Sequence, residues 1–227
     1  MPFTAFGVPP ARPEPSLTSV TNSGNNTATT AWGISRPAQA PGDMVITGLV
    51  SDADVTHGTL PGGPNGETAV TIAGATGGVA QRISVWYWIA TDSATAGTFT
   101  VVPSASEQWT ASVAIVPRDN FDTTTPVGEG SFTNSTAGTE TSAPITAFTA
   151  GATDGGGLLC AWIGVDTDPV TAGPTGWVDD ASVDRGAVSG TLSHRTILVR
   201  PSESVPAVSW VIAGDSSTTR AFIIRAP

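Results

Sequence analysis

Hydrophobic and polar residues alternate most clearly over residues 82–90, which read Arg-Ile-Ser-Val-Trp-Tyr-Trp-Ile-Ala. Alternation with a period of two among β-branched and aromatic residues indicates a β-strand. One face is uniformly apolar and is expected to lie on a core. The other face carries Trp86 and Trp88, which a strand places side by side. This second face is either covered by the same chain, as in a strand buried on both sides, or it contacts a partner. The residues of the apolar face are Ile83, Val85, Tyr87 and Ile89.

Similar short runs recur from Ser16 to the end of the chain, separated by segments rich in Gly, Pro, Asn and Asp. Runs of this kind bounded by turn residues are typical of strands. The number and spacing of the runs predict an all-β fold, a β-sandwich or a jelly roll. The predicted strands are residues 17–21, 27–34, 44–50, 68–73, 82–90, 98–102, 112–116, 145–149, 158–165, 191–200, 207–213 and 219–225.

The order of apolar runs and turns then restarts, which predicts a tandem duplication of a β-unit of about 100 residues. With an offset of 114 residues, the run 44–50 meets 158–164, and with an offset of 108 the run 113–116 meets 221–224. Whether the two units form one compact sandwich or two is open at this point. The predicted organisation is an extended arm (1–15), a first β-sandwich repeat (16–118), a linker (119–130) and a second repeat (131–227).

The arm contains five Pro residues and lacks a periodic pattern. Such a segment is extended and poor in internal hydrogen bonds. Its apolar side chains, Phe3, Phe6 and Val8, are candidate contacts with a neighbouring subunit. The alternative is an arm that folds back on its own domain.

Composition narrows the range of partners. The formal net charge is −10 and only 12% of residues are charged. A chain this acidic repels phosphate backbones and anionic lipid surfaces, so neither nucleic acid nor membrane is an expected partner. The N-terminus lacks the basic and apolar regions of a signal peptide, and no apolar stretch approaches 18 residues. We therefore expect synthesis in a cytoplasm without general secretory export.

Two pairs of carboxylates occupy matching places after apolar runs: Asp52 with Asp54, and Asp166 with Asp168. Such pairs can bind Ca²⁺, but Ca²⁺ needs six to eight oxygen ligands, and Asp is also a common turn residue. We therefore expect loop-forming residues and no metal. The two histidines, His57 and His194, are far apart in the sequence, and no zinc pattern surrounds either of them.

Catalytic motifs are not found in the sequence. There is no Gly-x-Ser-x-Gly elbow, no phosphate-binding Gly-rich loop and no context that pairs Glu residues for acid–base chemistry. Cys160, the single cysteine, lies in an apolar run where a buried, inert thiol is expected. We predict a protein without catalytic residues or cofactors. The seven Trp residues leave carbohydrate binding open, since aromatic rings can stack on sugars, although Trp more often fills cores.

Several short motifs together resemble a known group. They are Pro41-Gly42-Asp43 before an apolar run, the loop ending Gly176-Trp177, the strand 82–90 followed by Ala96-Gly97-Thr98-Phe99-Thr100, and the ending Ala114-Ile115-Val116-Pro117-Arg118, echoed by Phe222-Ile223-Ile224-Arg225-Ala226. The chain resembles β-sandwich virion structural proteins of tailed bacteriophages and prophages with GC-rich hosts, of the decoration, head-spike or tail-associated type.

The resemblance implies a non-enzymatic virion subunit that binds other virion proteins, as a homo-oligomer or within a large assembly. Its localisation would be the virion. The alternative is a carbohydrate-binding module that attaches the particle to a host glycan. A polysaccharide-degrading enzyme is the less expected third alternative. The candidate partner contacts are Phe3, Phe6, Val8, Trp86 and Trp88.

Overall fold

The computed structural model describes residues 15–72, 81–128, 130–151, 157–166, 170–197, 202 and 204–227; the side chains of 135–142, 196 and 197 lie outside this description. The expectations for Phe3, Phe6, Val8 and Asp168 fall outside the described residues. Within them, the chain forms antiparallel strands and one short 3₁₀ helix, Arg118–Asn120. The predicted all-β fold is confirmed. None of the described residues belongs to a helix long and apolar enough to cross a membrane.

The first half of the chain forms a five-stranded sheet, here named the N-terminal sheet, and a two-stranded ribbon. The order in the sheet is β1-β7-β3-β5-β4, and β2 pairs with β6 in the ribbon. The strands are β1 (Thr18–Thr29), β2 (Trp32–Arg36), β3 (Met44–Ser51), β4 (Val70–Thr71), β5 (Arg82–Ile89), β6 (Gly97–Val101) and β7 (Glu107–Val116).

The second half forms the C-terminal sheet and a second ribbon. The order in the sheet is β12-β13-β11-β15-β8, with β9 also paired to β15, and β10 pairs with β14 in the ribbon. The strands are β8 (Val127–Gly128), β9 (Phe132–Ile145), β10 (Phe148–Thr149), β11 (Gly157–Asp166), β12 (Val178–Asp184), β13 (Val188–Ile197), β14 (Ser204–Val205) and β15 (Val208–Arg225).

The two halves share one strand order. Adding eight to each label converts β1-β7-β3-β5-β4 into β9-β15-β11-β13-β12, and β2-β6 into β10-β14. The register agrees as well, because Met44 pairs with Val116 in the first half and Leu158 pairs with Ile224 in the second. These are the positions that the offsets of 114 and 108 relate. A tandem duplication remains a prediction about origin, and the shared order and register support it.

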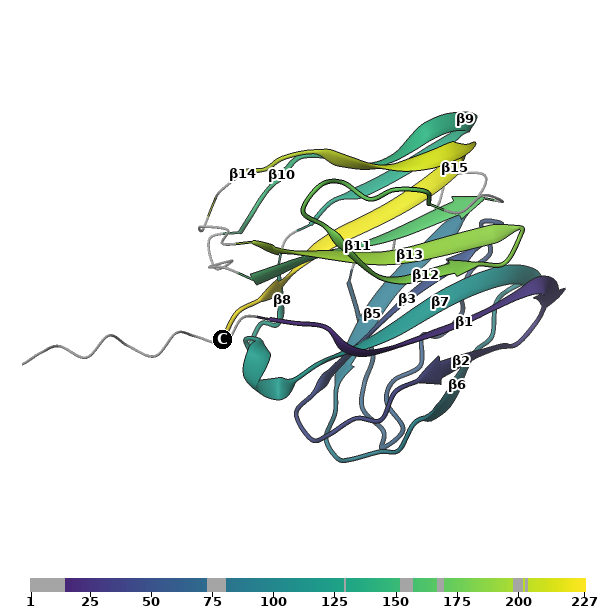
Figure 1. Cartoon of the computed structure of the whole chain (residues 1–227). Helices are drawn as coiled ribbons and strands as arrows, with labels where there is room; N and C mark the ends of the chain where they lie inside the picture. The colour runs from purple at the N-terminus through teal and green to yellow at the C-terminus, as the bar shows by residue number, and fades with distance from the viewer. Residues whose placement is uncertain are drawn as a thin grey trace, which may run out of the picture.

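The two large sheets face each other (Figure 1). Across the interface, β1 contacts β12, β7 contacts β13, β3 contacts β11 and β5 contacts β15. Apolar side chains from both halves therefore form one central core, and neither half buries its inner face alone. The core includes Met44, Ile46, Val85, Ala114, Cys160, Trp162, Leu192 and Phe222.

Each large sheet also carries a core on its outer face. The outer core of the N-terminal sheet includes Trp86, Trp88 and Trp109, and residues of the β2–β6 ribbon join it. The outer core of the C-terminal sheet forms around Trp210 and Ile163. Because β3 and β11 are covered on both faces, their sequences read as nearly continuous apolar runs.

The structure departs from the predicted strands in several places. The Asn- and Gly-rich segment 22–26 is not a turn, because it continues β1 and pairs with β7. The predicted strands 207–213 and 219–225 are one strand, β15, whose pairing with β9 shifts register around Gly214, a residue with φ +86°. The strands β9 and β12 escaped prediction because their Ser-, Thr- and Asp-rich sequences lack a clear apolar alternation.

Candidate functional site

Trp86 and Trp88 lie beneath residues of their own chain, and both side chains are 0% exposed. The indole N–H of Trp86 donates to the carbonyl of Pro61 at 3.0 Å, and that of Trp88 donates to Gln39 Oε1 at 3.1 Å. Phe99 contacts both rings edge-on. A partner protein or a sugar could reach these rings only after this cover was removed. Of the two alternatives in the sequence, coverage by the same chain is the one that the structure contains.

A buried carboxylate stabilises this cover. Glu67 is 7% exposed and accepts hydrogen bonds from Gln39 Nε2 at 3.1 Å, from the Asn65 backbone N–H at 2.8 Å and from the Thr91 backbone N–H at 3.1 Å. Burial alone would raise the pKa of Glu67, but these hydrogen bonds outweigh it and lower the pKa. Glu67 is therefore an ionised structural residue that connects the loop 60–67 to Trp88 through Gln39.

His57 is also part of the packing. Its ring is 2% exposed and lies between two serine hydroxyl groups. The distance from Nε2 to Ser51 Oγ is 2.9 Å, and the distance from Nδ1 to Ser84 Oγ is 2.8 Å. Ser51 donates its own proton to the carbonyl of Ala53, so it accepts from Nε2–H and leaves Nδ1 to accept from Ser84. Burial, with a smaller effect of Arg82, lowers the pKa of His57 to about 3. His57 is neutral at physiological pH.

The second histidine forms a hydrogen bond between β13 and β12 of the C-terminal sheet. His194 Nδ1 lies 2.5 Å from Asp180 Oδ2, and Cys160 is its neighbour across the β11–β13 ladder. The succession Cys, His, Asp has the residue types of a nucleophilic triad. Cys160, however, is 1% exposed within the central core, and burial raises the pKa of its thiol well above the usual value. The expected buried and inert thiol is confirmed.

The carboxylates Asp52 and Asp166, which the sequence related only by their offset of 114, meet where β3 and β11 end. Their side chains lie within hydrogen-bonding reach of each other, and such a bond requires a proton on one of the two carboxyl groups. Burial, the hydrogen bond to Asp166 and the nearby charges of Asp166, Glu107 and Asp215 raise the pKa of Asp52 to about 7. Asp54 instead forms an ion pair with Arg82 at 2.8 Å. Among the described residues no group of three or more His, Cys, Asp or Glu is arranged to hold a metal ion.

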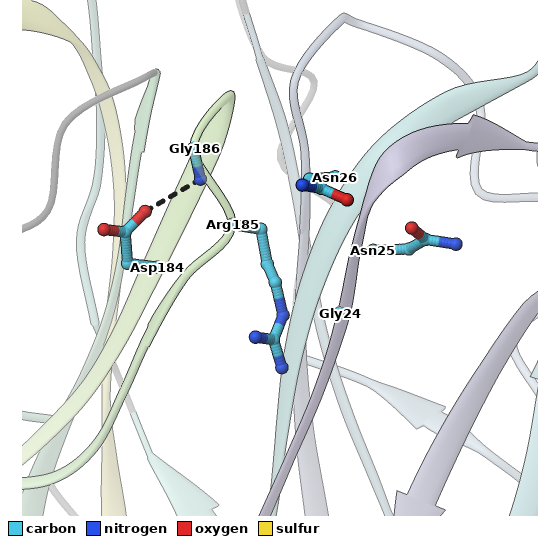
Figure 2. Close-up of a pocket in the computed structure, with 6 residues that line it drawn as sticks. All are labelled: Gly24, Asn25, Asn26, Asp184, Arg185 and Gly186. Carbon is cyan, nitrogen blue, oxygen red and sulfur yellow. Dashed lines mark hydrogen bonds between the residues drawn. The ribbon is translucent and has the colours of Figure 1, made fainter.

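An open hollow of about 370 Å³ lies at the same end of the sandwich, between β1 and the turn from β12 to β13 (Figure 2). The side chain of Arg185 extends from the turn toward β1 and lies against Gly24, where a Cβ would approach its Nε to 2.9 Å. Sequence reasoning missed this site because its two halves are about 160 residues apart in the chain. The lining residues are Gly24, Asn25, Asn26, Asp184, Arg185 and Gly186.

No protein-family model, curated protein or solved structure matches this chain.

Proposed function

We propose that the protein is a non-enzymatic structural subunit of a bacteriophage particle, a capsid decoration, spike or tail-associated protein that binds neighbouring virion proteins. The proposal follows the sequence resemblance described above. The observation that carries it is the edge strand β1 of the N-terminal sheet.

The strand β1 is a long edge with little protection against pairing. It has 12 residues, contains no charged residue and no Pro, and within the described part of the chain it pairs only with β7. Its register is regular from Thr21 to Asn25. Proteins that act alone usually protect such an edge with Lys, Pro or a very short strand. An uncharged edge of this length suits strand addition by another subunit.

Two other sheet edges are better protected than β1. The opposite edge of the N-terminal sheet, β4, has two residues. The edge strand β12 of the C-terminal sheet carries three carboxylates, Asp179, Asp180 and Asp184. Like charges on paired strands repel, so β12 disfavours pairing with its own copy. These differences favour β1 over β4 and β12 as the assembly surface.

The reactive side chains described above support a structural role, because packing already uses them. His57 joins two Ser side chains, Glu67 anchors a loop and Cys160 fills the core. A polysaccharide hydrolase needs two carboxyl groups about 5 Å or more apart on either side of a glycosidic bond. Asp52 and Asp166 are instead hydrogen bonded to each other. They do not have the geometry of a hydrolase pair.

The test is the oligomeric state of the purified protein and its presence in particles. Asn22, an exposed residue in the regular part of β1, is changed to Lys, which places a charge on the edge. We expect the wild type to self-associate in light scattering and N22K to be monomeric with an unchanged melting temperature. V102K is the control, because Val102 is 62% exposed and follows the ribbon strand β6; it should associate like the wild type.

Mass spectrometry of phage particles purified from the source culture supplies the second measurement. The proposal requires the protein in those particles. A wild type that stays monomeric and is missing from the particles would overturn it.

A further inference from the structure

We infer that the hollow between β1 and the β12–β13 turn is a binding site for a neutral saccharide. The inference does not rest on the proposed assembly role. It rests on the polar groups that line the hollow, on their incomplete hydrogen bonding and on the charge around them.

The hollow contains polar groups whose hydrogen bonds are incomplete. Within the described part of the chain, no acceptor is hydrogen bonded to the Arg185 guanidinium, and the residue bonds only through its backbone N–H, which donates to the Val188 carbonyl. The backbone carbonyl of Asn26 accepts a hydrogen bond from Gln108 Nε2, and the side-chain amide of Asn26 is open to a ligand. Asn25 uses Oδ1 to accept from the Thr27 N–H at 2.9 Å, which leaves its amide donors. These groups are available to a ligand.

The turn that presents Arg185 has a defined geometry. Asp184 Oδ1 accepts from the Gly186 backbone N–H at 2.8 Å, drawn as the dashed line in Figure 2, and from Ser189 Oγ at 3.3 Å. Gly186 has a φ of +81°, which favours Gly at this place in the turn. Across the hollow, Gly24 has no side chain and leaves room for the Arg185 stem, since a Cβ there would lie 2.9 Å from Arg185 Cγ. The guanidinium is therefore held beside β1 without an ion pair.

The mixture of donors and acceptors selects the class of ligand. Arg185 and the Asn side-chain NH₂ groups donate, whereas Asp184 Oδ2 and the side-chain carbonyl of Asn26 accept. Hydroxyl groups both donate and accept, so a polyhydroxyl ligand can use the whole set. A carboxylate or phosphate ligand would use only the donors and would be repelled by Asp184. A volume of about 370 Å³ falls within the range of ligand sites.

The surrounding charge favours the same class. Glu107, Asp166 and Asp215 gather around Asp52 at this end of the sandwich, and the chain has a net charge of −10. At physiological ionic strength these charges act over roughly 8 Å. A neutral ligand avoids this repulsion, whereas an anion approaches against it.

The test uses saturation-transfer NMR on the full chain with separate neutral sugars: glucose, galactose, mannose, rhamnose and N-acetylglucosamine. Galacturonate and inorganic phosphate are the anionic probes. We expect at least one neutral sugar to bind. R185A and N26A should each weaken this binding about tenfold, the effect of losing a hydrogen bond worth about 1.4 kcal/mol. Both residues are exposed, so the melting temperature should not change.

The matched control is R118A, which removes another exposed arginine at the far end of β7, beyond Val116. This variant should bind sugar like the wild type. Three outcomes would overturn the inference: no neutral sugar binds, sugar binding survives both R185A and N26A, or only galacturonate or phosphate binds.

Discussion

Trp88 combines apolar packing with a polar connection in one side chain. Its ring lies in the outer core of the N-terminal sheet, next to Phe99 at a centroid distance of 5.7 Å. Its N–H donates to Gln39, which in turn donates to Glu67. The ring holds the cover over the sheet by burial, and the hydrogen bonds orient the loop that carries Glu67.

Replacement of Trp88 tests this role. We expect W88A to lower the free energy of unfolding by about 3–5 kcal/mol, because it opens a large cavity and leaves Gln39 without its donor. W88F should cost less, since it keeps most of the apolar volume. Urea denaturation monitored by circular dichroism measures both changes. V102A is the control: Val102 is 62% exposed, so its loss should change stability by less than about 0.5 kcal/mol. A W88A variant as stable as V102A would contradict the described packing.

At the level of elements, β3 and β11 meet through complementary volumes. A Cβ on Gly48 of β3 would lie 2.0 Å from the Trp162 indole of β11, and a Cβ on Gly164 of β11 would lie 2.4 Å from Val50 of β3. Gly48 and Trp162 are related by the offset of 114, as are Val50 and Gly164. A small residue thus faces a larger one twice: in the first contact the glycine belongs to β3, and in the second it belongs to β11. Two identical β-units could not pack in this way, so the two halves of this chain are complementary to each other.

A substitution in this contact should report on the spacing of the two sheets. G48A is expected to destabilise the protein by about 1–3 kcal/mol, the usual cost of overpacking, because the rigid indole cannot move aside. G33A is the matched control, since a Cβ at Gly33 would meet only Thr98 Cγ2 at an ordinary 3.5 Å. Thermal unfolding of both variants measures the difference. Equal melting temperatures for G48A and G33A would exclude the close sheet contact.

At the level of the whole molecule, the central core joins both halves of the chain. Residues of the N-terminal sheet and the C-terminal sheet contribute to it together. Each large sheet therefore buries its inner face only against the other. The hydrogen bond between Asp52 and Asp166 lies at one end of this interface and connects the halves a second time.

The Asp52–Asp166 pair predicts a pH dependence. The folded pKa of Asp52 is about 7, above its ordinary value of 3.8, so the folded state binds the shared proton more tightly than the unfolded chain does. The resulting stability is complete below about pH 4 and is lost as the pH rises through 7. D52N cannot ionise and should melt higher than the wild type at pH 8, with little difference at pH 4.

The expected gain at pH 8 is roughly 2–4 °C, the shift that about 1 kcal/mol produces in a chain of this size, after discounting for the partial exposure of the pair. Differential scanning calorimetry at the two pH values measures it. The exposed Asp119 provides the control, because a surface substitution such as D119N should leave the melting temperature nearly unchanged at both pH values. If D52N raises the melting temperature by the same amount at pH 4 and pH 8, the two carboxyl groups do not share a proton.

Local pattern determined the class of fold and much of its strand inventory. The alternation over residues 82–90 predicted β5, with Ile83 and Val85 on the central core. The apolar runs predicted β3 and β11 nearly to their ends. These features follow from the sequence because a strand turns successive side chains to opposite faces, so one short segment contains the information about both faces. The expected burial of Cys160 followed from the same local signal, whereas the pattern left open what covers Trp86 and Trp88.

Only the tertiary structure decided which surfaces meet. The pairing of Asp52 with Asp166, the fit of Gly48 against Trp162 and the hollow between Asn26 and Arg185 each join residues more than 110 positions apart. The long strand β9 and the continuous β15 likewise formed because neighbouring strands satisfied their backbone groups, not because their own residues alternate. Contacts between sheets depend on how layers stack in three dimensions. The alternation of apolar and polar residues shows which face of a strand is apolar, but it does not show which other strand covers that face.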